Sequence, residues 1–230
     1  DVPFRERLSA LTHLPVFIEN SGRACALAQL WSRSEPDASH DLAYVSVSDG
    51  LGVGIVVRGE VLRGRHNVGG EFGHTPIDVD GPACACGASG CLEAYVSNIA
   101  TLSRYFGREI SPRKPLPTDV ATFTMEDLIA RARGGDARAT SALQATAHYL
   151  GIGLGGLVNA YDPDRILLSG EIVAAWDLLE PIVRQAMAQR MLPPVTGDIE
   201  IVPVPLSAAP RLRGAAALVA TPLFAAPQVP

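Results

Sequence analysis

The feature that most restricts this chain is a cluster of three cysteines within eight positions, preceded by a histidine. His74 is followed ten positions later by the run CACGASGC, from Cys84 to Cys91. Four such side chains meet only on a tight turn, and Gly87 and Gly90 permit the positive φ values that would bring the last cysteine back. Zinc prefers nitrogen and sulfur donors, and three Cys with one His leave no open position. We predict a structural zinc site with these ligands: His74, Cys84, Cys86 and Cys91.

The simpler alternative for this cluster is three buried cysteines beside an unrelated histidine. The fourth cysteine, Cys25, stands alone in a stretch that reads as a helix. Crowded cysteines in a chain without a signal-peptide pattern favour metal over disulfides. The sequence therefore predicts a metalloprotein in the cytoplasm.

Charge and hydropathy exclude two classes of partner. The net charge is −5, and the basic residues are scattered rather than clustered, so the chain is a poor nucleic-acid binder by itself. No apolar stretch reaches the ~20 residues that a bilayer span requires. We expect no membrane partner, and DNA contact only through a domain that this chain lacks.

The hydrophobic pattern alternates between short strands and amphipathic helices, which favours a parallel or mixed sheet flanked by helices. A polar loop is expected at 34–41, and the last residues are rich in Pro and Ala. The predicted strands are 14–18, 42–48, 54–58, 74–79, 164–169 and 199–202. The predicted helices are 3–13, from 21 (capped by Ser21), from 92, 125–133, 136–159, 172–189 and 212–219.

Several motifs together resemble the ROK family (repressors, open reading frames, kinases). The run from Glu71-x-x-His74 to Cys91-Leu92-Glu93 is similar to the family's zinc signature. The segments LPVFIEN at 14–20, GLGVG at 50–54, DPDRILLSG at 162–170 and RGAA at 213–216 are similar to other family segments. The resemblance covers nearly the whole chain, and the zinc motif is its most specific part.

The resemblance implies an α/β, actin-like ATPase (ribonuclease H-like) fold with two lobes, assembled as dimers or tetramers. Residues 1–48 would be the remainder of the smaller lobe, 49–224 the larger sugar- and zinc-binding lobe, and 225–230 a loose tail. The family's first strands, with an Asp-x-Gly-Gly-Thr motif, would precede residue 1.

The resemblance also implies a sugar or amino-sugar site. The matching positions are Asn20, Gly50, Glu71, His74 and Glu93. Carboxylates accept hydrogen bonds from sugar hydroxyls, and an amide can both donate and accept. Zinc could hold one ring nitrogen of His74 and leave the other N–H facing the sugar. Helix capping is an equal alternative for Asn20, and plain surface charge is the alternative for the two glutamates.

Three departures argue against phosphoryl transfer. Ser21 occupies the position of the kinases' catalytic Asp, and a serine cannot act as the base that accepts the proton of the attacking hydroxyl. Asp49 and Glu171 put negative charge where the kinases carry Thr and Gly, which would repel a polyphosphate. The upstream phosphate motif is not in this sequence.

These observations favour the sugar-sensing effector domain of a ROK-type transcriptional regulator, with no catalytic residue. Two alternatives remain open: an ATP-dependent sugar kinase of glucokinase or N-acetyl amino sugar kinase type that uses another base, and a relic that binds neither sugar nor nucleotide. The sequence does not name the sugar.

Overall fold

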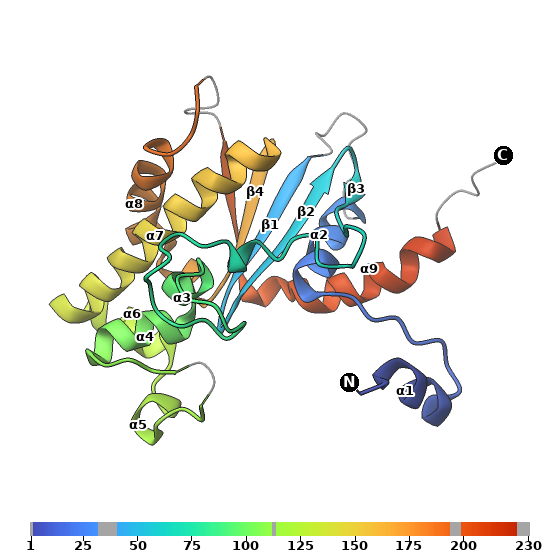
Figure 1. The fold of residues 1–230 in the computed structure, drawn as a ribbon, viewed down its shortest axis with the longest axis horizontal. Coiled ribbons are helices and arrows are strands. Elements are labelled where there is room, and N and C mark those ends of the chain that lie inside the picture. Colours follow the sequence, from blue (N-terminus) through green and yellow to red (C-terminus); the bar gives the residue numbers. More distant parts are fainter. Residues whose placement is uncertain (1, 32–40, 112–113, 194–198, 225–230) are drawn as a thin grey trace.

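A mixed five-stranded sheet forms the centre of the molecule (Figure 1). This computed structural model describes residues 2–31, 41–111, 114–193 and 199–224, with side chains described up to residue 220. Most of the loop predicted at 34–41, and the tail at 225–230, lie outside the described residues. The strand order is β3-β2-β1-β4-β5, and the strands are β1 (Leu42–Val47), β2 (Leu51–Val57), β3 (Glu60–Val61), β4 (Arg165–Gly170) and β5 (Glu200–Val204).

The sheet changes direction at its central strand. β1 pairs antiparallel with β2 through a tight hairpin, and parallel with β4 on its other side. β4 in turn runs parallel to β5. The end of β1 and the end of β4 therefore lie at the same edge of the sheet, which places the hairpin turn beside the residues that follow Gly170.

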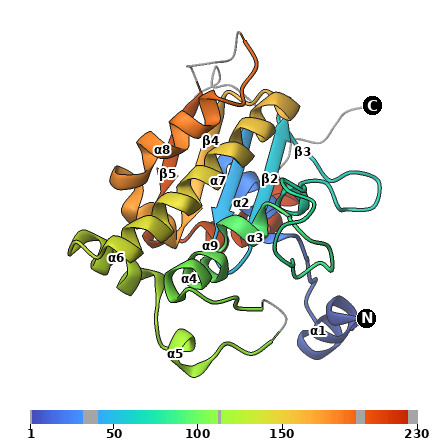
Figure 2. The same ribbon diagram turned by 60° about the vertical axis from the view of Figure 1, so that its left-hand side comes forward.

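Helices cover both faces of the sheet (Figure 2). On one face lie the long helix α7 and helix α8, and on the other lie α2 and α9, which pack against each other. The bounds are α2 (Ser21–Trp31), α7 (Ala137–Tyr161), α8 (Trp176–Ala188) and α9 (Pro210–Phe224). The remaining helices are α1 (Phe4–Thr12), α3 (Glu93–Val96), α4 (Asn98–Phe106), α5 (Thr118–Ala121) and α6 (Met125–Arg133), with 3-10 turns η1 (Phe72–His74), η2 (Glu171–Ala175) and η3 (Leu206–Ala208).

Strand β1 is buried on both faces, as its apolar sequence requires. Val45 and Val47 point into the larger core, which is shared with α7 and α8. Leu42 and Tyr44 point into a smaller core, which also holds Cys25 of α2. The alternation follows from the period of two along a strand.

Glycines permit two close contacts that fix the layers. A Cβ at Gly54 in β2 would lie 2.2 Å from the carbonyl oxygen of Gly22 in α2. A Cβ at Gly151 in α7 would lie 2.4 Å from the carbonyl oxygen of Val183 in α8. In the second contact, the missing side chain of Gly151 lets α8 approach α7 closely. Strand β2 begins at Leu51, earlier than the predicted 54–58, because residues 51–53 also pair with β1.

Two predicted strands are wrong. Residues 14–18 form no strand, and Leu14, Phe17 and Ile18 are exposed; no described segment supplies the ladder partner that a strand needs. Residues 74–79 contain the end of η1 and one isolated bridge, between Pro76 and Cys91. The other predicted elements are present with shifted ends, and η2 replaces the start of the helix predicted at 172–189.

Within the described residues, no helix has the length and apolarity needed to cross a bilayer.

Candidate metal and ligand site

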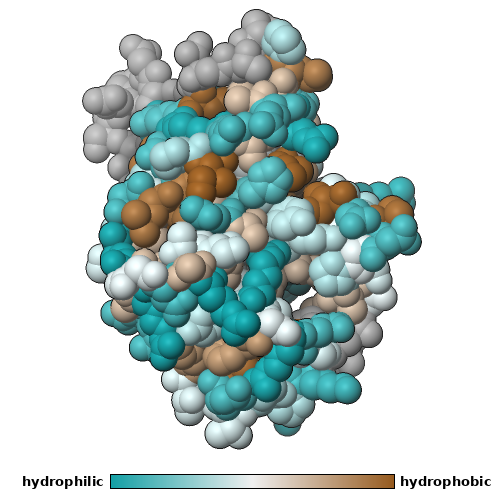
Figure 3. Space-filling view, turned by 90° about the vertical axis from the view of Figure 1, so that its left-hand side faces the viewer, coloured by the Kyte–Doolittle hydropathy of each residue, from teal (hydrophilic) through white to brown (hydrophobic). Residues whose placement is uncertain are grey.

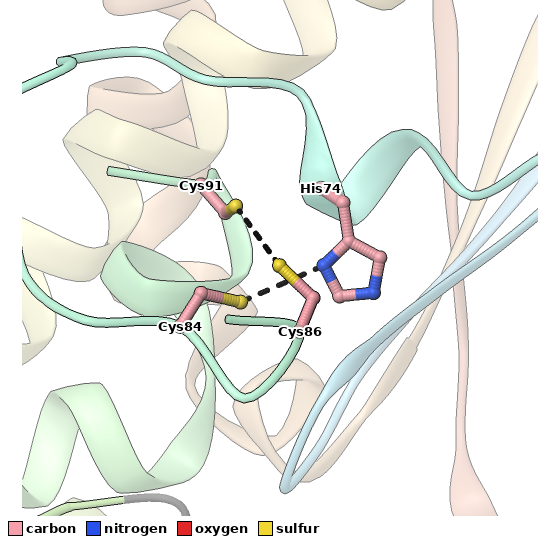
Figure 4. Close-up of side chains that lie close together, drawn as sticks. All are labelled: His74, Cys84, Cys86 and Cys91. Carbon is pink, nitrogen blue, oxygen red and sulfur yellow. Dashed lines mark hydrogen bonds between the residues drawn. The ribbon is translucent and has the colours of Figure 1, made fainter. Parts of the chain in front are cut away.

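The loop between η1 and α3 brings His74 and the three clustered cysteines together (Figure 4). One potential ligand atom from each residue lies within 4.8 Å of all the others. The Cys84 Sγ is 3.6 Å from the His74 Nδ1, and the Cys86 Sγ is 3.7 Å from the Cys91 Sγ. In a tetrahedral site with Zn–S bonds of ~2.3 Å, neighbouring sulfurs are about 3.7 Å apart. The donor set and these two distances therefore suit a tetrahedral, thiolate-binding cation.

The turn that gathers the ligands depends on its glycines. Gly87 and Gly90 have φ values of 110° and 69°, as predicted. A Cβ at Gly90 would lie 1.4 Å from the carbonyl oxygen of Asp78, so no other residue fits there without a rearrangement. The Cys84 N–H donates to the Ala88 carbonyl at 2.9 Å and closes the turn.

Burial affects the three thiols differently. It raises the pKa of Cys84 to about 12 and also raises the pKa of Cys91. Cys86 is exposed, and the hydrogen bond from the Ala88 backbone holds the pKa of its thiol below the usual range. A bound cation must therefore displace protons from the two buried thiols, which a metal ion does when it binds thiolates.

The two carboxylates predicted to contact a sugar flank this cluster. Glu93 accepts a hydrogen bond from the Leu51 N–H at 2.9 Å through Oε2, while its Oε1 is 3.6 Å from the Cys84 Sγ. A Cβ at Gly50 would lie 2.8 Å from the same Oε2, so Gly50 lets the carboxylate reach the hairpin. Glu71 is exposed, and its Oε2 is 4.0 Å from the His74 Nε2. The ring nitrogen that faces away from the thiols thus points towards Glu71.

Asn20 caps a helix, which is one of the two roles that the sequence left open, and it also contacts Glu71. Its Oδ1 accepts from the Gly22 N–H at 2.8 Å and caps α2. Its Nδ2 donates to the Glu71 Oε1 at 3.2 Å. The prediction that Ser21 caps this helix is wrong, because Ser21 is already its first helical residue. The exposed Ser21 hydroxyl lies 3.9 Å from the position of a Cβ on Gly52 in β2.

A buried ion-pair network next to Asn20 was not predicted. Glu19 contacts the Nε of Arg23 at 2.8 Å and the Nε of Arg63 at 3.0 Å. Burial acts to raise the pKa of Glu19, but the hydrogen bonds from Arg23 and the Asn20 backbone outweigh it and hold the pKa below the usual range. Arg23 also donates to the Asn67 carbonyl at 3.0 Å. The i, i+4 spacing of Glu19 and Arg23 was the available signal. Because Glu19 is paired with both arginines, it is poorly placed to replace the catalytic base that the kinases carry at the position of Ser21.

The two carboxylates that the sequence placed at a nucleotide site lie close together. Asn98, the first residue of α4, donates through Nδ2 to the Glu171 Oε2 at 3.1 Å and to the Asp49 Oδ1 at 3.4 Å. Asp49 belongs to the hairpin turn, and Glu171 begins η2 after β4. Asp49 and Glu171 lie close together because they follow the parallel strands β1 and β4, which end at the same side of the sheet. Asn98 itself had no recognisable signal in the sequence.

The fold and the site define a class: an actin-type α/β protein with a loop that brings one His and three Cys side chains together. The ROK family model matches residues 1–221, and the chain belongs to the ROK family. It is 30% identical over 203 residues to the xylose repressor of Bacillus spizizenii, covering 88% of this chain and 50% of that protein. The chain thus spans about half the length of this curated relative.

Solved structures agree with this assignment. A ROK family transcriptional regulator described as a homolog of the E. coli MLC protein superposes with a TM-score of 0.76 at 34% identity, covering 93% of this chain and 54% of that one. The ROK hexokinase of Thermus thermophilus superposes with a TM-score of 0.73 at 32% identity, covering 95% and 69%. Regulators and kinases are thus both similar to this chain, and its fold is the actin-like ATPase fold.

Proposed function

We propose that this chain is the sugar-sensing effector region of a ROK-type transcriptional regulator rather than a sugar kinase. The observation that carries the proposal is the pair of carboxylates, Asp49 and Glu171, held on one amide of Asn98. The resemblance to ROK kinases puts these two positions at the polyphosphate of ATP, where two negative charges would oppose its binding. Ser21 supports the same conclusion, because its hydroxyl cannot serve as the base that transfer to a sugar requires.

The ligand in this proposal is a sugar or amino sugar held beside the hairpin. Asn20, Glu71 and His74 form one side of the position, and Gly50 with Glu93 forms the other. The carboxylates accept from hydroxyl groups, and the Asn20 amide and the His74 Nε2 can donate to them. Each of these residues is fixed by a second contact, so the ligand meets groups that are already oriented.

Zinc is the metal we propose for the cluster of His74, Cys84, Cys86 and Cys91. Three thiolates and one imidazole complete a tetrahedron and leave no position for water, so the ion is structural. Coordination through Nδ1 would fix the tautomer of His74 and leave the proton on Nε2, which faces Glu71. The metal then orients a ligand-binding residue without touching the ligand.

Regulation follows from a difference in affinity. A sugar shifts an equilibrium between two arrangements only if it binds one of them more tightly. We assign DNA contact to a DNA-binding domain outside this 230-residue chain and expect the regulator to act as a homodimer or tetramer in the cytoplasm. The smaller lobe would end near residue 48, and residues 49–224 would form the larger one.

A sugar kinase is the second candidate, and the similarity to the Thermus thermophilus hexokinase favours it. A coupled ATPase assay with a panel of pentoses, hexoses and N-acetyl amino sugars, together with calorimetry on the same panel, separates the two. We expect a sugar to bind and raise the melting temperature, with no sugar-dependent ATP turnover. Sugar-dependent turnover above background would establish the kinase, and a panel without any binding would leave neither function.

A further inference from the structure

A cavity of about 640 Å³ begins at Glu93 and the metal-binding loop and extends along α4. The residues of α4 that line it, among them Ala100, Ser103 and Arg104, recur at helical spacing. Arg108, which follows the helix, and Tyr149 of α7 also contribute to its wall. Figure 3 shows the surface hollowed on this side of the molecule. The cavity is lined by Glu93 but not by Asn20 or Glu71, so it extends beyond the proposed sugar position.

Arg104 places a cation in this wall. Its Nη1 donates to the Thr146 Oγ1 at 2.9 Å and its Nη2 to the Tyr95 carbonyl at 2.6 Å. The guanidinium carbon lies 5.4 Å from the centre of the Tyr149 ring. Among the residues that the structure describes, no carboxylate is within ion-pair distance of Arg104. Burial lowers its pKa, as expected for a partly desolvated cation that lacks a counter-ion.

Other charged groups also line the cavity. Glu93 contacts Leu51 and Cys84, Asp49 accepts from Asn98, Arg108 is paired with Asp119, and Glu109 is exposed. Glu93 and Asp49 make the sugar end acidic, and Arg104 places a cation on α4. A partly buried cation gains most from an anion that enters the same water-poor space.

We propose that this cavity binds the anionic substituent of an acidic saccharide, a carboxylate or phosphate that pairs with Arg104 while the neutral ring lies at Glu93. The inference rests on the proposed sugar-binding function and names the class of its ligand. Tyr149 supplies an aromatic surface for the apolar face of the connecting atoms, in the usual composition of a ligand pocket. The alternative is that Arg104 only joins α3, α4 and α7 through its two hydrogen bonds, in which case it affects stability and not ligand choice.

Calorimetry with matched neutral and acidic ligands tests this assignment. The probes are hexoses with their 6-phosphates, and neutral disaccharides with counterparts in which one CH₂OH is a carboxylate, all titrated into the zinc-loaded chain. We expect at least one acidic member to bind about tenfold more tightly than its neutral partner, with a preference that falls as salt rises. The two series distinguish phosphate from carboxylate.

Three variants separate recognition from structure. Arg104→Gln should abolish the acidic preference while leaving the neutral affinity within about twofold, whereas a purely structural role would change the melting temperature without changing the preference. Ala100→Phe keeps Arg104 and fills the cavity, so it should also abolish the preference, and it serves if Arg104→Gln does not fold. Arg133→Gln, the control, removes a paired charge from α6, outside the cavity, and should have little effect.

If neutral sugars bind and no acidic counterpart binds more tightly, this inference is overturned and the proposed function stands. A preference that survives both Arg104→Gln and Ala100→Phe would also overturn it. No binding of any sugar, neutral or acidic, would refute the proposed function and this inference with it.

Discussion

The two sides of the β1–β2 hairpin turn differ in what they offer a ligand. On one side, the Leu51 N–H and Gly50 receive Glu93, beside the cluster of His74 and three cysteines. On the other side, Asp49 shares the Asn98 amide with Glu171. In the proposed function, the first side binds the sugar, and the acidic groups of the second side oppose the polyphosphate that a kinase would bind. One short turn thus carries two positions whose chemistry can change separately.

Loss of the metal should change stability and sugar binding the most, because the metal would hold the loop of His74 and the three cysteines on the first side. Cys91→Ser should lower bound zinc from one ion per chain to none and destabilise the fold by ~3–5 kcal/mol, lowering Tm by roughly 10 °C. Sugar binding should be lost with it. Metal analysis and thermal unfolding measure both quantities.

Cys25→Ala is the control for that experiment, since Cys25 is a buried residue of α2 and lies outside the cluster. It should keep its zinc. Retention of stoichiometric zinc and full stability in Cys91→Ser would contradict the assignment of the cluster, and a strong chelator should reproduce the variant's unfolding in the unmodified chain.

Glu93→Gln sharpens the comparison within the first side. The amide oxygen can still accept from Leu51, so the hairpin contact survives, while the charge that receives sugar hydroxyls is lost. Hydrogen bonds to charged groups contribute ~1.5–3 kcal/mol, so we expect sugar affinity to fall about 10- to 100-fold by calorimetry. Zinc content should be unchanged, and loss of the metal here would show that Glu93 supports the cluster rather than the ligand.

Removing charge from the second side should make it resemble a nucleotide site. In Asp49→Asn with Glu171→Gln, both side chains can still accept from Asn98, but two negative charges disappear. Each opposes a phosphate by ~1 kcal/mol in a solvated site, so ATP affinity should rise about tenfold or more in a fluorescence titration. Glu126→Gln, which removes an exposed charge from α6, should leave it unchanged. Tight ATP binding by the unmodified chain would contradict the claim that Asp49 and Glu171 oppose nucleotide binding.

The smallest effect should come from Asn20, and two substitutions divide its roles. Asn20→Ala removes the cap of α2 and should cost about 1 kcal/mol, a fall in Tm of roughly 2–4 °C. Asn20→Asp keeps a capping oxygen but loses the donor to Glu71, so stability should hold while sugar affinity falls. Equal sugar affinity in Asn20→Asp and the unmodified chain would assign the residue to capping alone.

The sequence predicted the features that depend on local spacing. The glycine turn and the four clustered side chains follow from positions 74–91, and the alternation of strands and helices follows from hydrophobic periodicity. Asn98 and Arg104 could not be found in this way, because their side-chain hydrogen-bond partners lie 42 to 73 positions away and only the packing of α4 brings them together. The run at 14–18 has the apolar composition of a strand, yet a strand also requires a neighbour to pair with, which composition alone does not reveal.

The contact between Gly22 and Gly54 has a consequence for ligand binding. With no side chain between them, helix α2 and strand β2 are in direct backbone contact, and Asn20 at the start of the helix is fixed relative to Leu51 at the start of the strand. The groups on either side of the sugar position are therefore preorganised. A ligand that enters loses little free energy to ordering the protein, and more of its interaction energy remains as affinity. A larger residue at position 22 or 54 would reduce that affinity without touching the ligand.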